Sequence, residues 1–308
     1  MTELSRTLPS LPLDEWEPTK LTLHLYLQIV GKVRLARMPR RNHWWNITLY
    51  VTPTGLSTRT MPDGRDGAFE IAVNLRQHRV EVVTSNGYTG GFSLEPALSV
   101  ASFHGRLFDT LRDAGIDVQI RGLPYDLPVT RPFAQIEEHA SYDPEYAARF
   151  HQILLWVQDV FEEFSGRFYG KTCPVHLYWH HLDLAVTRFS GKPGPPQDPA
   201  KSVVERDAYS HEVISFGFWA GDEQVRGPAF YSYTYPAPEG LGREPLEPSG
   251  AKWTDEAGSM AVVMYDDLRS DADPRAALVS FLESAYQAGA RLAGWDVEGL
   301  TVPPLEAL

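Results

Sequence analysis

The chain has 308 residues, a formal net charge of −12, a hydrophobic fraction of 43% and one cysteine. This length corresponds to about two ordinary domains, and the hydrophobic fraction excludes a wholly disordered chain. A lone thiol cannot form an internal disulfide, so we expect a cytoplasmic protein. No apolar run approaches the ~20 residues of a membrane helix, the N-terminus lacks a signal-peptide pattern, and the acidic surplus argues against a nucleic-acid partner.

The first predicted element is a helix from about Pro18 to about Met38. Leu21, Leu25 and Ile29 share one helical stripe, although the leucines here also alternate as they would in a strand. The length of the segment and its early proline favour the helix. Short turns then separate strands that we expect near 43–52, 55–60, 68–75, 79–84 and 88–93. A helix over 97–114 and a strand over 117–121 follow.

A second series of elements begins at Asp143-Pro144, where an N-cap and a first-position proline predict a helix with an apolar stripe. Strands are expected near 174–180, 182–188, 211–219, 229–235 and 259–264. Asp273-Pro274 then predicts a closing helix over 274–293. Two long loops, 191–209 and 236–250, are typical of lids or mobile surface segments.

The two series appear in the same order and share weak sequence similarity. Residues 47–52 resemble 175–180, residues 69–73 resemble 211–215, and residues 115–118 resemble 294–297. We therefore predict an α+β fold built by tandem duplication of an α-β4-α unit. Its antiparallel meander sheets are expected to be covered by helices on one face, in a pseudo-twofold arrangement like that of the TATA-binding protein. The expected organisation is one compact unit over 1–308, with repeats over 14–122 and 139–297 and a C-terminal tail over 298–308.

Charge is unevenly distributed along the chain. Residues 1–120 contain 13 basic and 12 acidic residues, whereas residues 121–308 contain 15 and 28. One dense basic stretch lies just before His43-Trp44-Trp45, and consists of Lys32, Arg34, Arg37, Arg40 and Arg41. Such a stretch could hold an anionic ligand. We favour the solvated last turn of a helix, where cations suit the macrodipole.

Several signatures of known chemistry are missing. The sequence contains no Gly-rich phosphate loop, no dinucleotide fingerprint and no nucleophile elbow, so we expect no cofactor. A single cysteine excludes a thiolate-rich metal site. His176 and His180 would lie about 13 Å apart along a strand and could not share a metal. Glu212 would point away from His211, so we predict no metal site.

Polar and aromatic side chains alternate with apolar ones in the matching strands of both series. The polar face of the first series contains Trp44, Asn46 and Tyr50. That of the second contains His176, Tyr178 and His180, extended by His211, Ser215 and Trp219. This combination is typical of the wall of a small-molecule pocket. The alternative is that these amphipathic rings fill the seam between two related halves.

Other candidate groups have simpler explanations. His24, Gln28 and Lys32 form a polar helical stripe, for which solvent exposure is an adequate explanation. Arg188 could anchor a carboxylate or phosphate, although an ordinary salt bridge is the stronger alternative. Cys173 follows Lys171, but no base is placed beside it by the sequence.

The chain resembles an uncharacterised bacterial family, domain of unknown function 5996, over nearly its whole length. The matching blocks are Leu13–Lys20, Gln28–Lys32, Asn42–Trp45, His139–Pro144, Leu184–Gly191 and Tyr209–Trp219. The sequence departs from the family pattern at His180-His181-Leu182, which favours His176 and His211 over His180 as functional groups. The resemblance implies no established activity.

Two function classes remain open. The favoured hypothesis is a cytoplasmic enzyme or small-molecule-binding protein, with His176 and His211 as acid–base groups. Its ligand would be small, and anionic if Arg188 anchors it. The expected ligand-binding residues are Trp44, Asn46, Tyr50, Tyr178, Arg188, Ser215 and Trp219. The alternative is a non-catalytic module for protein interaction or dimerisation, which would expose a large apolar patch.

Overall fold

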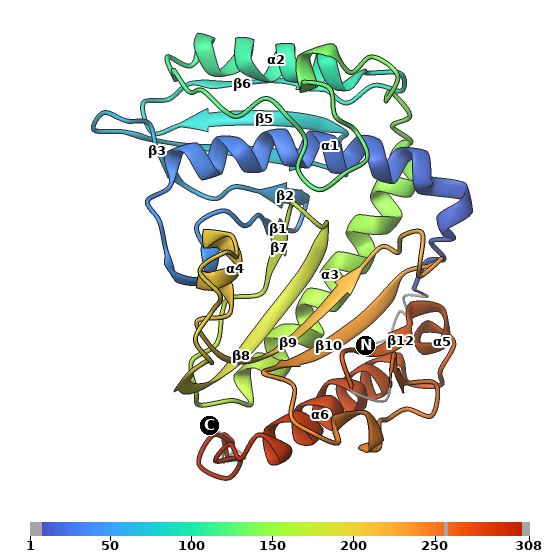
Figure 1. Ribbon diagram of the computed structural model, residues 1–308. Coiled ribbons are helices and arrows are strands. Elements are labelled where there is room, and N and C mark those ends of the chain that lie inside the picture. Colours follow the sequence, from blue (N-terminus) through green and yellow to red (C-terminus); the bar gives the residue numbers. More distant parts are fainter. Residues whose placement is uncertain (1–7, 256–257, 304–308) are drawn as a thin grey trace. The chain divides into compact units, whose positions relative to one another are not determined.

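The computed structural model describes residues 8–255 and 258–303 and contains two antiparallel sheets flanked by helices (Figure 1). The predicted α+β class is therefore confirmed. The chain divides into two compact units that interleave in sequence. Among the described residues, unit 1 comprises 8–39, 46–156 and 177–182, and unit 2 comprises 40–45, 157–176 and the remainder from 183. None of the helices in these ranges is long and apolar enough to cross a membrane.

Unit 1 opens with α1 (Leu13–Arg37), which begins five residues before the predicted start at Pro18. Leu23, Leu25 and Leu27 are all fully buried. Because successive residues of a helix point in different directions, this helix is buried on most of its circumference. That burial explains why an alternating pattern of leucines, which also fits a strand, occurs here in a helix.

The sheet of unit 1 is an antiparallel meander. Its strands are β1 (Tyr50–Thr52), β2 (Gly55–Ser57), β3 (Met61–Pro62), β4 (Ala68–Asn74), β5 (Arg79–Thr84) and β6 (Thr89–Ser93). The strand order is β1-β2-β4-β5-β6, with β3 paired to β4. Helix α2 (Val100–Asp113) is N-capped by Ser99 and packs on β5 and β6. A 3-10 turn, η2 (Phe133–Gln135), contacts α2.

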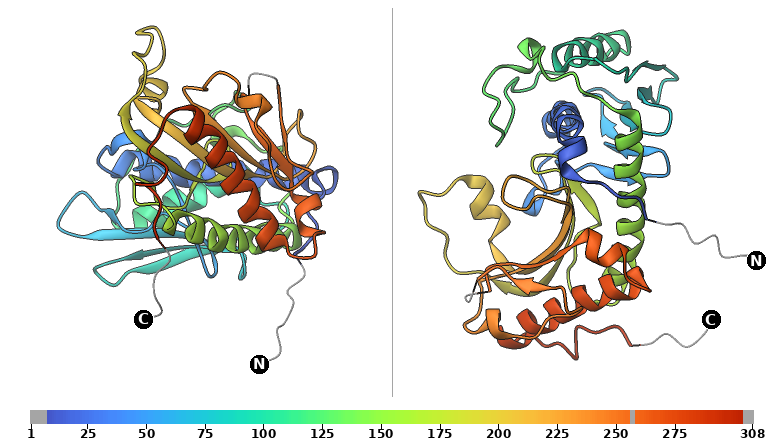
Figure 2. Two further views of the ribbon diagram at one scale, coloured as in Figure 1. Left: turned by 90° about the horizontal axis from the view of Figure 1, so that it is seen from below. Right: turned by 90° about the vertical axis from the view of Figure 1, so that its right-hand side faces the viewer.

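Unit 2 contains the second half of α3 (Pro144–Gly166) and a sheet with the order β11-β12-β10-β9-β8-β7. The strands are β7 (His176–Tyr178), β8 (Asp183–Pro193), β9 (His211–Trp219), β10 (Ala229–Tyr235), β11 (Lys252–Trp253) and β12 (Ala261–Met264). Strand β7 begins in unit 2 and continues into the 177–182 segment of unit 1. Helix α6 (Pro274–Leu292) runs along β9 and β10 (Figures 1 and 2). Shorter elements are η1 (Asn42–Trp44), α4 (Val203–Ala208), η3 (Leu241–Arg243) and α5 (Tyr265–Arg269).

The two faces of the β8-β9-β10 sheet have different roles. The register pairs Thr187 with Ser215 and Ser215 with Tyr233, so these side chains share one face. On the opposite face, the Phe164 ring of α3 contacts the Phe216 ring with centroids 4.8 Å apart. That apolar face packs against the helices, which leaves the Ser215 face for polar and aromatic groups.

Several predicted boundaries are wrong. The strand expected over 43–52 is replaced by η1 and the short β1, and no strand forms over 117–121. Strand β7 contains only three of the residues expected over 174–180. Trp179 and His180 lie in the turn after it, so the expected alternation of His176 and His180 on one strand face does not exist.

Two further expectations concern a loop and the C-terminus. The loop over 191–209 contains α4, whose Ser202 and Glu205 form a capping box. Residues 298–303 of the predicted tail are anchored within unit 2 next to the end of α3, where Tyr169 N donates to Leu300 O at 2.9 Å and Val302 N donates to Arg167 O at 3.1 Å. Residues 304–308 lie outside the described residues.

Candidate functional site

Three of the expected site residues lie together on the Ser215 face of unit 2. His211, Ser215 and Trp219 follow one another at every fourth position of β9, and a strand places such residues on the same face. Ser215 Oγ lies 2.9 Å from Thr187 Oγ1 on β8. This face therefore contains the predicted polar and aromatic residues of β9, with His211 and Trp219 about 26 Å apart at its two ends.

Three other expected residues belong to unit 1. Asn46 is 2% exposed and Tyr50 is 5% exposed. The Tyr50 ring is stacked against the guanidinium of Arg59, 3.7 Å from the ring centroid. The Tyr178 ring meets the His180 ring edge-on with centroids 5.2 Å apart. Asn46, Tyr50 and Tyr178 therefore belong to a different unit from the site residues on β9.

His176 and Arg188 are buried in unit 2, at 0% and 1% exposure. Arg188 lies on the helix-covered face, where its guanidinium stacks 3.5 Å from the Phe164 ring centroid and 4.4 Å from that of Tyr286. It also donates a hydrogen bond to Phe164 O. Burial lowers the pKa of Arg188 to about 10. These contacts place Arg188 in the apolar core, away from any solvent-borne ligand.

A cluster in which His211 is the only residue that the sequence analysis proposed as a site residue lies at the His211 end of the same face. Lys171 Nζ is 2.8 Å from His43 Nε2, and the ammonium lies 4.5 Å from the Phe189 ring centroid and 5.4 Å from that of Trp45. The rings of His43 and His211 are 5.6 Å apart in an edge-on arrangement. We call these five residues, His43, Trp45, Lys171, Phe189 and His211, the His43–Lys171 cluster.

The hydrogen bonds determine the protonation states in this cluster. The Lys171 ammonium has no acceptor atom, so it donates to His43 Nε2. His43 is then neutral and has its proton on Nδ1, which is oriented to donate to Ala208 O at 3.4 Å. Burial is the main cause that lowers the pKa of His43, and the Lys171 charge lowers it further. Burial also lowers the pKa of Lys171.

The backbone beneath the cluster is strained. His43 has φ 53° and Trp44 has φ 61°, both in the left-handed region that non-glycine residues rarely adopt. Each such residue costs of the order of 1–3 kcal/mol and persists only where its surroundings require it. Arg40 stacks over the Trp44 ring at 5.7 Å and binds the Asp207 carboxylate at 2.8 Å. These contacts hold η1 against α4, and His43, a residue of η1, is thereby positioned in the cluster.

The other end of the face contains a tyrosine network. Tyr231 OH donates to Asp183 Oδ2 at 2.6 Å, and the Tyr231 ring lies 5.5 Å from the Trp219 ring. Gly217 permits this arrangement, because a Cβ there would lie 2.3 Å from the Tyr231 ring. Cross-strand packing thus accounts for the row of tyrosines on β10.

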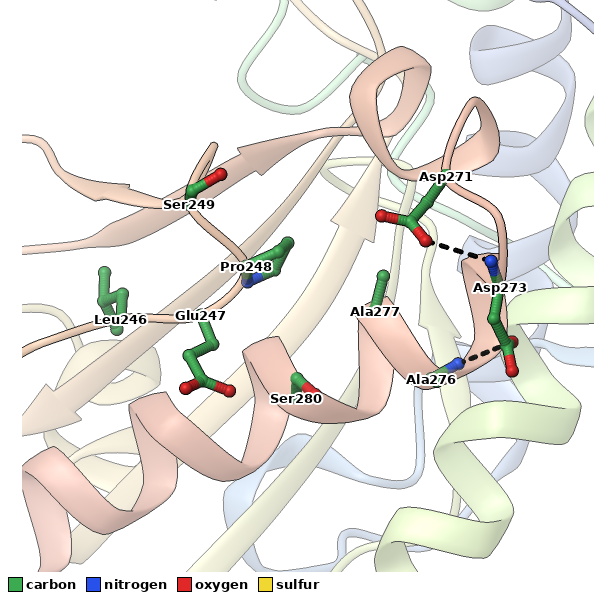
Figure 3. Close-up of a pocket in the computed structure, with 9 residues that line it drawn as sticks. All are labelled: Leu246, Glu247, Pro248, Ser249, Asp271, Asp273, Ala276, Ala277 and Ser280. Carbon is green, nitrogen blue, oxygen red and sulfur yellow. Dashed lines mark hydrogen bonds between the residues drawn. The ribbon is translucent and has the colours of Figure 1, made fainter.

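A shallow groove of about 470 Å³ lies elsewhere in unit 2, at the start of α6 (Figure 3). Its two aspartates are already engaged in local structure. Asp273 Oδ1 accepts from Ala276 N at 3.0 Å, and Asp271 Oδ1 accepts from Asp273 N at 2.9 Å. The N-cap carboxylate occupies the place where an anion would meet the helix, so this groove is a weaker candidate than the His43–Lys171 cluster. Within the described residues, no three His, Cys, Asp or Glu side chains converge in a way that could hold a metal ion.

Comparison with known proteins identifies the family. No curated protein and no solved structure matches the chain. Residues 8–302, nearly the whole chain, match the family described as "Family of unknown function (DUF5996)". The chain therefore belongs to the family DUF5996, as its sequence blocks predicted.

Proposed function

We propose that unit 2 binds a small anionic ligand at the His43–Lys171 cluster. The observation that supports this most directly is the hydrogen bond from Lys171 Nζ to the neutral His43 imidazole at 2.8 Å. A neutral partner orients the ammonium without neutralising its charge. The carboxylate whose charge acts on both Lys171 and His43 is Asp207, and it binds the Arg40 guanidinium at 2.8 Å. The cluster thus offers a positive charge in the half of the chain where acidic residues outnumber basic ones by 28 to 15.

The rings around Lys171 indicate the rest of the ligand. Trp45 and Phe189 flank the ammonium, and flat apolar rings favour a ligand with an aromatic or hydrocarbon part. A carboxylate or phosphate attached to such a group would meet Lys171 with its charged end and the rings with its body. Small aromatic carboxylates are therefore the ligand class that suits this cluster.

Any chemical step at this site would use the histidines of the cluster. His43 is neutral, and His211 lies beside it with Nδ1 3.1 Å from Ser210 Oγ. We retain His211 as the candidate acid–base group, since the two ring nitrogens of an imidazole can donate and accept a proton. His176 is fully buried, and we no longer place it in the site.

Benzoate is a direct probe of this proposal. We expect saturation-transfer NMR to detect benzoate bound to the wild-type protein. Removing a hydrogen bond to a charged group costs about 1.5–3 kcal/mol, so Lys171→Met should weaken binding at least tenfold. Lys201→Met, which removes the same charge at an exposed site, should bind as the wild type does. Equal binding by Lys171→Met, or no binding by the wild type, would contradict the proposal.

We also infer that the two units arose by tandem duplication. Residues 14–122 and 139–297 each contain a long helix, then antiparallel strands, then a closing helix, and this shared order supports their common descent. The TATA-binding-protein-like pseudo-twofold arrangement belongs to this proposal as well.

We further propose that the protein is cytoplasmic. Cys173, the single cysteine of the chain, is buried as a free thiol. Disulfides are common in secreted proteins and rare in the reducing cytoplasm, so the composition supports this location.

A further inference from the structure

The polar stripe of α1, which the sequence suggested was solvent-exposed, is buried in unit 1. His24, Gln28 and Lys32 are 5%, 0% and 7% exposed. Lysine is almost never buried to this degree unless a partner compensates its charge. The expectation of a solvated face was therefore wrong, and each polar group needs its own explanation.

The first two members of the stripe have clear structural roles. His24 Nε2 donates to Trp179 O at 2.9 Å, which ties the turn after β7 to α1. Gln28 both donates to Tyr125 O and accepts from Tyr125 N, each at 2.8 Å. These bonds fix two separate chain segments, one around Trp179 and one around Tyr125, on the same side of α1.

Lys32 is the third member, and it has no such role. Its ammonium lies 5.6 Å from the Trp179 ring centroid and 6.0 Å from that of Phe133. Among the residues that the structure describes, no hydrogen-bond acceptor and no carboxylate lies within bonding distance of this ammonium. Burial is the main cause that lowers the pKa of Lys32, and the positive charge of Arg121 lowers it further.

The surroundings of Lys32 are held rigidly. Trp179 Nε1 donates to Ile47 O at 2.8 Å, and Gly31 lies so close to the Trp179 ring that a Cβ there would be 2.2 Å from it. Phe133 is fully buried, and its backbone N–H donates to Gly122 O at 2.8 Å. The rings cannot move away easily to let Lys32 reach another partner. An anion from the solvent would give the ammonium the opposite charge that the described part of the chain does not supply.

We propose that Lys32 and Arg121 form a binding site for a small oxyanion, either a phosphate or a carboxylate, beside the rings of Trp179 and Phe133. The ammonium supplies the point charge, and the positive charge of the exposed Arg121, which acts on Lys32, adds to the attraction of an anion. This site belongs to unit 1 and is independent of the His43–Lys171 cluster.

The test removes the unit 2 site first. In a Lys171→Met background, thermal unfolding is followed in sodium phosphate and in sodium acetate, each against sodium chloride at equal ionic strength. A ligand that binds only the folded state raises the melting temperature, and we expect a rise of roughly 2 °C or more with one of the two oxyanions. The anion that gives the rise distinguishes a phosphate from a carboxylate site.

Lys32→Met added to this background should abolish the rise, and Arg121→Ala should reduce it. Methionine has a similar length and no charge, so we expect the double variant to fold, which far-UV circular dichroism checks. Lys201→Met in place of Lys32→Met is the matched control and should keep the full rise. If neither anion raised the melting temperature, as expected for an uncharged Lys32 that binds no anion, the proposal would be overturned. An equal rise after Lys32→Met would also overturn it. All of these variants contain Lys171→Met, so a failure of the proposed ligand site at Lys171 would not affect the outcome of this experiment.

Discussion

Gly31 offers the sharpest test of the packing around α1. The substitution Gly31→Ala places a Cβ 2.2 Å from Trp179 Cδ1 and 2.4 Å from its Nε1, well inside van der Waals contact. The indole cannot simply slide aside, because Nε1 donates to Ile47 O at 2.8 Å and the Trp179 carbonyl accepts from His24. We therefore expect Gly31→Ala to destabilise unit 1.

The size of the effect follows from three terms. Overpacking a rigid core costs about 1–3 kcal/mol, and loss of the buried indole hydrogen bond costs about 1–3 kcal/mol more. The higher helix propensity of alanine raises the free energy of unfolding by up to about 1 kcal/mol. The net expectation is a loss of about 3 kcal/mol in the free energy of unfolding.

Urea unfolding followed by far-UV circular dichroism measures this loss. Gly105→Ala is the matched control, because Gly105 lies inside α2 of the same unit and a Cβ there would meet nothing within 4 Å. The control should be neutral or more stable by up to about 1 kcal/mol. If Gly31→Ala were as stable as the wild type, the tight contact between α1 and Trp179 would be refuted.

Two further predictions concern titratable groups. Burial lowers the pKa of His24 to about 4 and that of His180 to about 3, so the unfolded chain binds more protons than the folded one below pH 6.5. The free energy of unfolding should therefore fall as the pH drops below 6.5, by up to about 1.4 kcal/mol per pH unit for each histidine. Urea unfolding midpoints between pH 7 and pH 5 measure this slope. An unchanged slope in His24→Gln would contradict the assignment. Burial raises the pKa of Cys173 to about 12. Iodoacetamide at pH 8 should therefore alkylate this thiol slowly in the native protein and rapidly in urea. Fast labelling of the native protein would instead show that the thiol is accessible.

Local sequence patterns predicted most of the regular structure. Asp273-Pro274 correctly placed the start of α6, where Asp273 accepts from Ala276 N. The strands over 211–219 and 229–235 were predicted with the bounds that β9 and β10 show. These predictions succeed because caps, turn residues and hydrophobic periodicity act within one element. The same alternation along β9 also placed His211, Ser215 and Trp219 on one face.

The ends of short strands were harder to predict. Trp179 and His180 continue the alternating pattern of β7, yet they leave the strand, because the Trp179 side chain packs on Gly31 and its carbonyl accepts from His24. These contacts come from a helix about 150 residues earlier in the chain. Tertiary packing overrides a weak local preference for extended structure.

Local sequence patterns were enough to predict the α+β class, the order of the main helices and strands, and the polar face of β9. The burial of each polar group and its partners depend instead on tertiary packing. Lys171 meets His43 across 128 residues, and the Trp179 ring covers Lys32 from far along the chain. Periodicity specifies the direction of a side chain relative to its own element. The contacts between elements, and hence the burial and the charge environment of each side chain, depend on how separate segments pack.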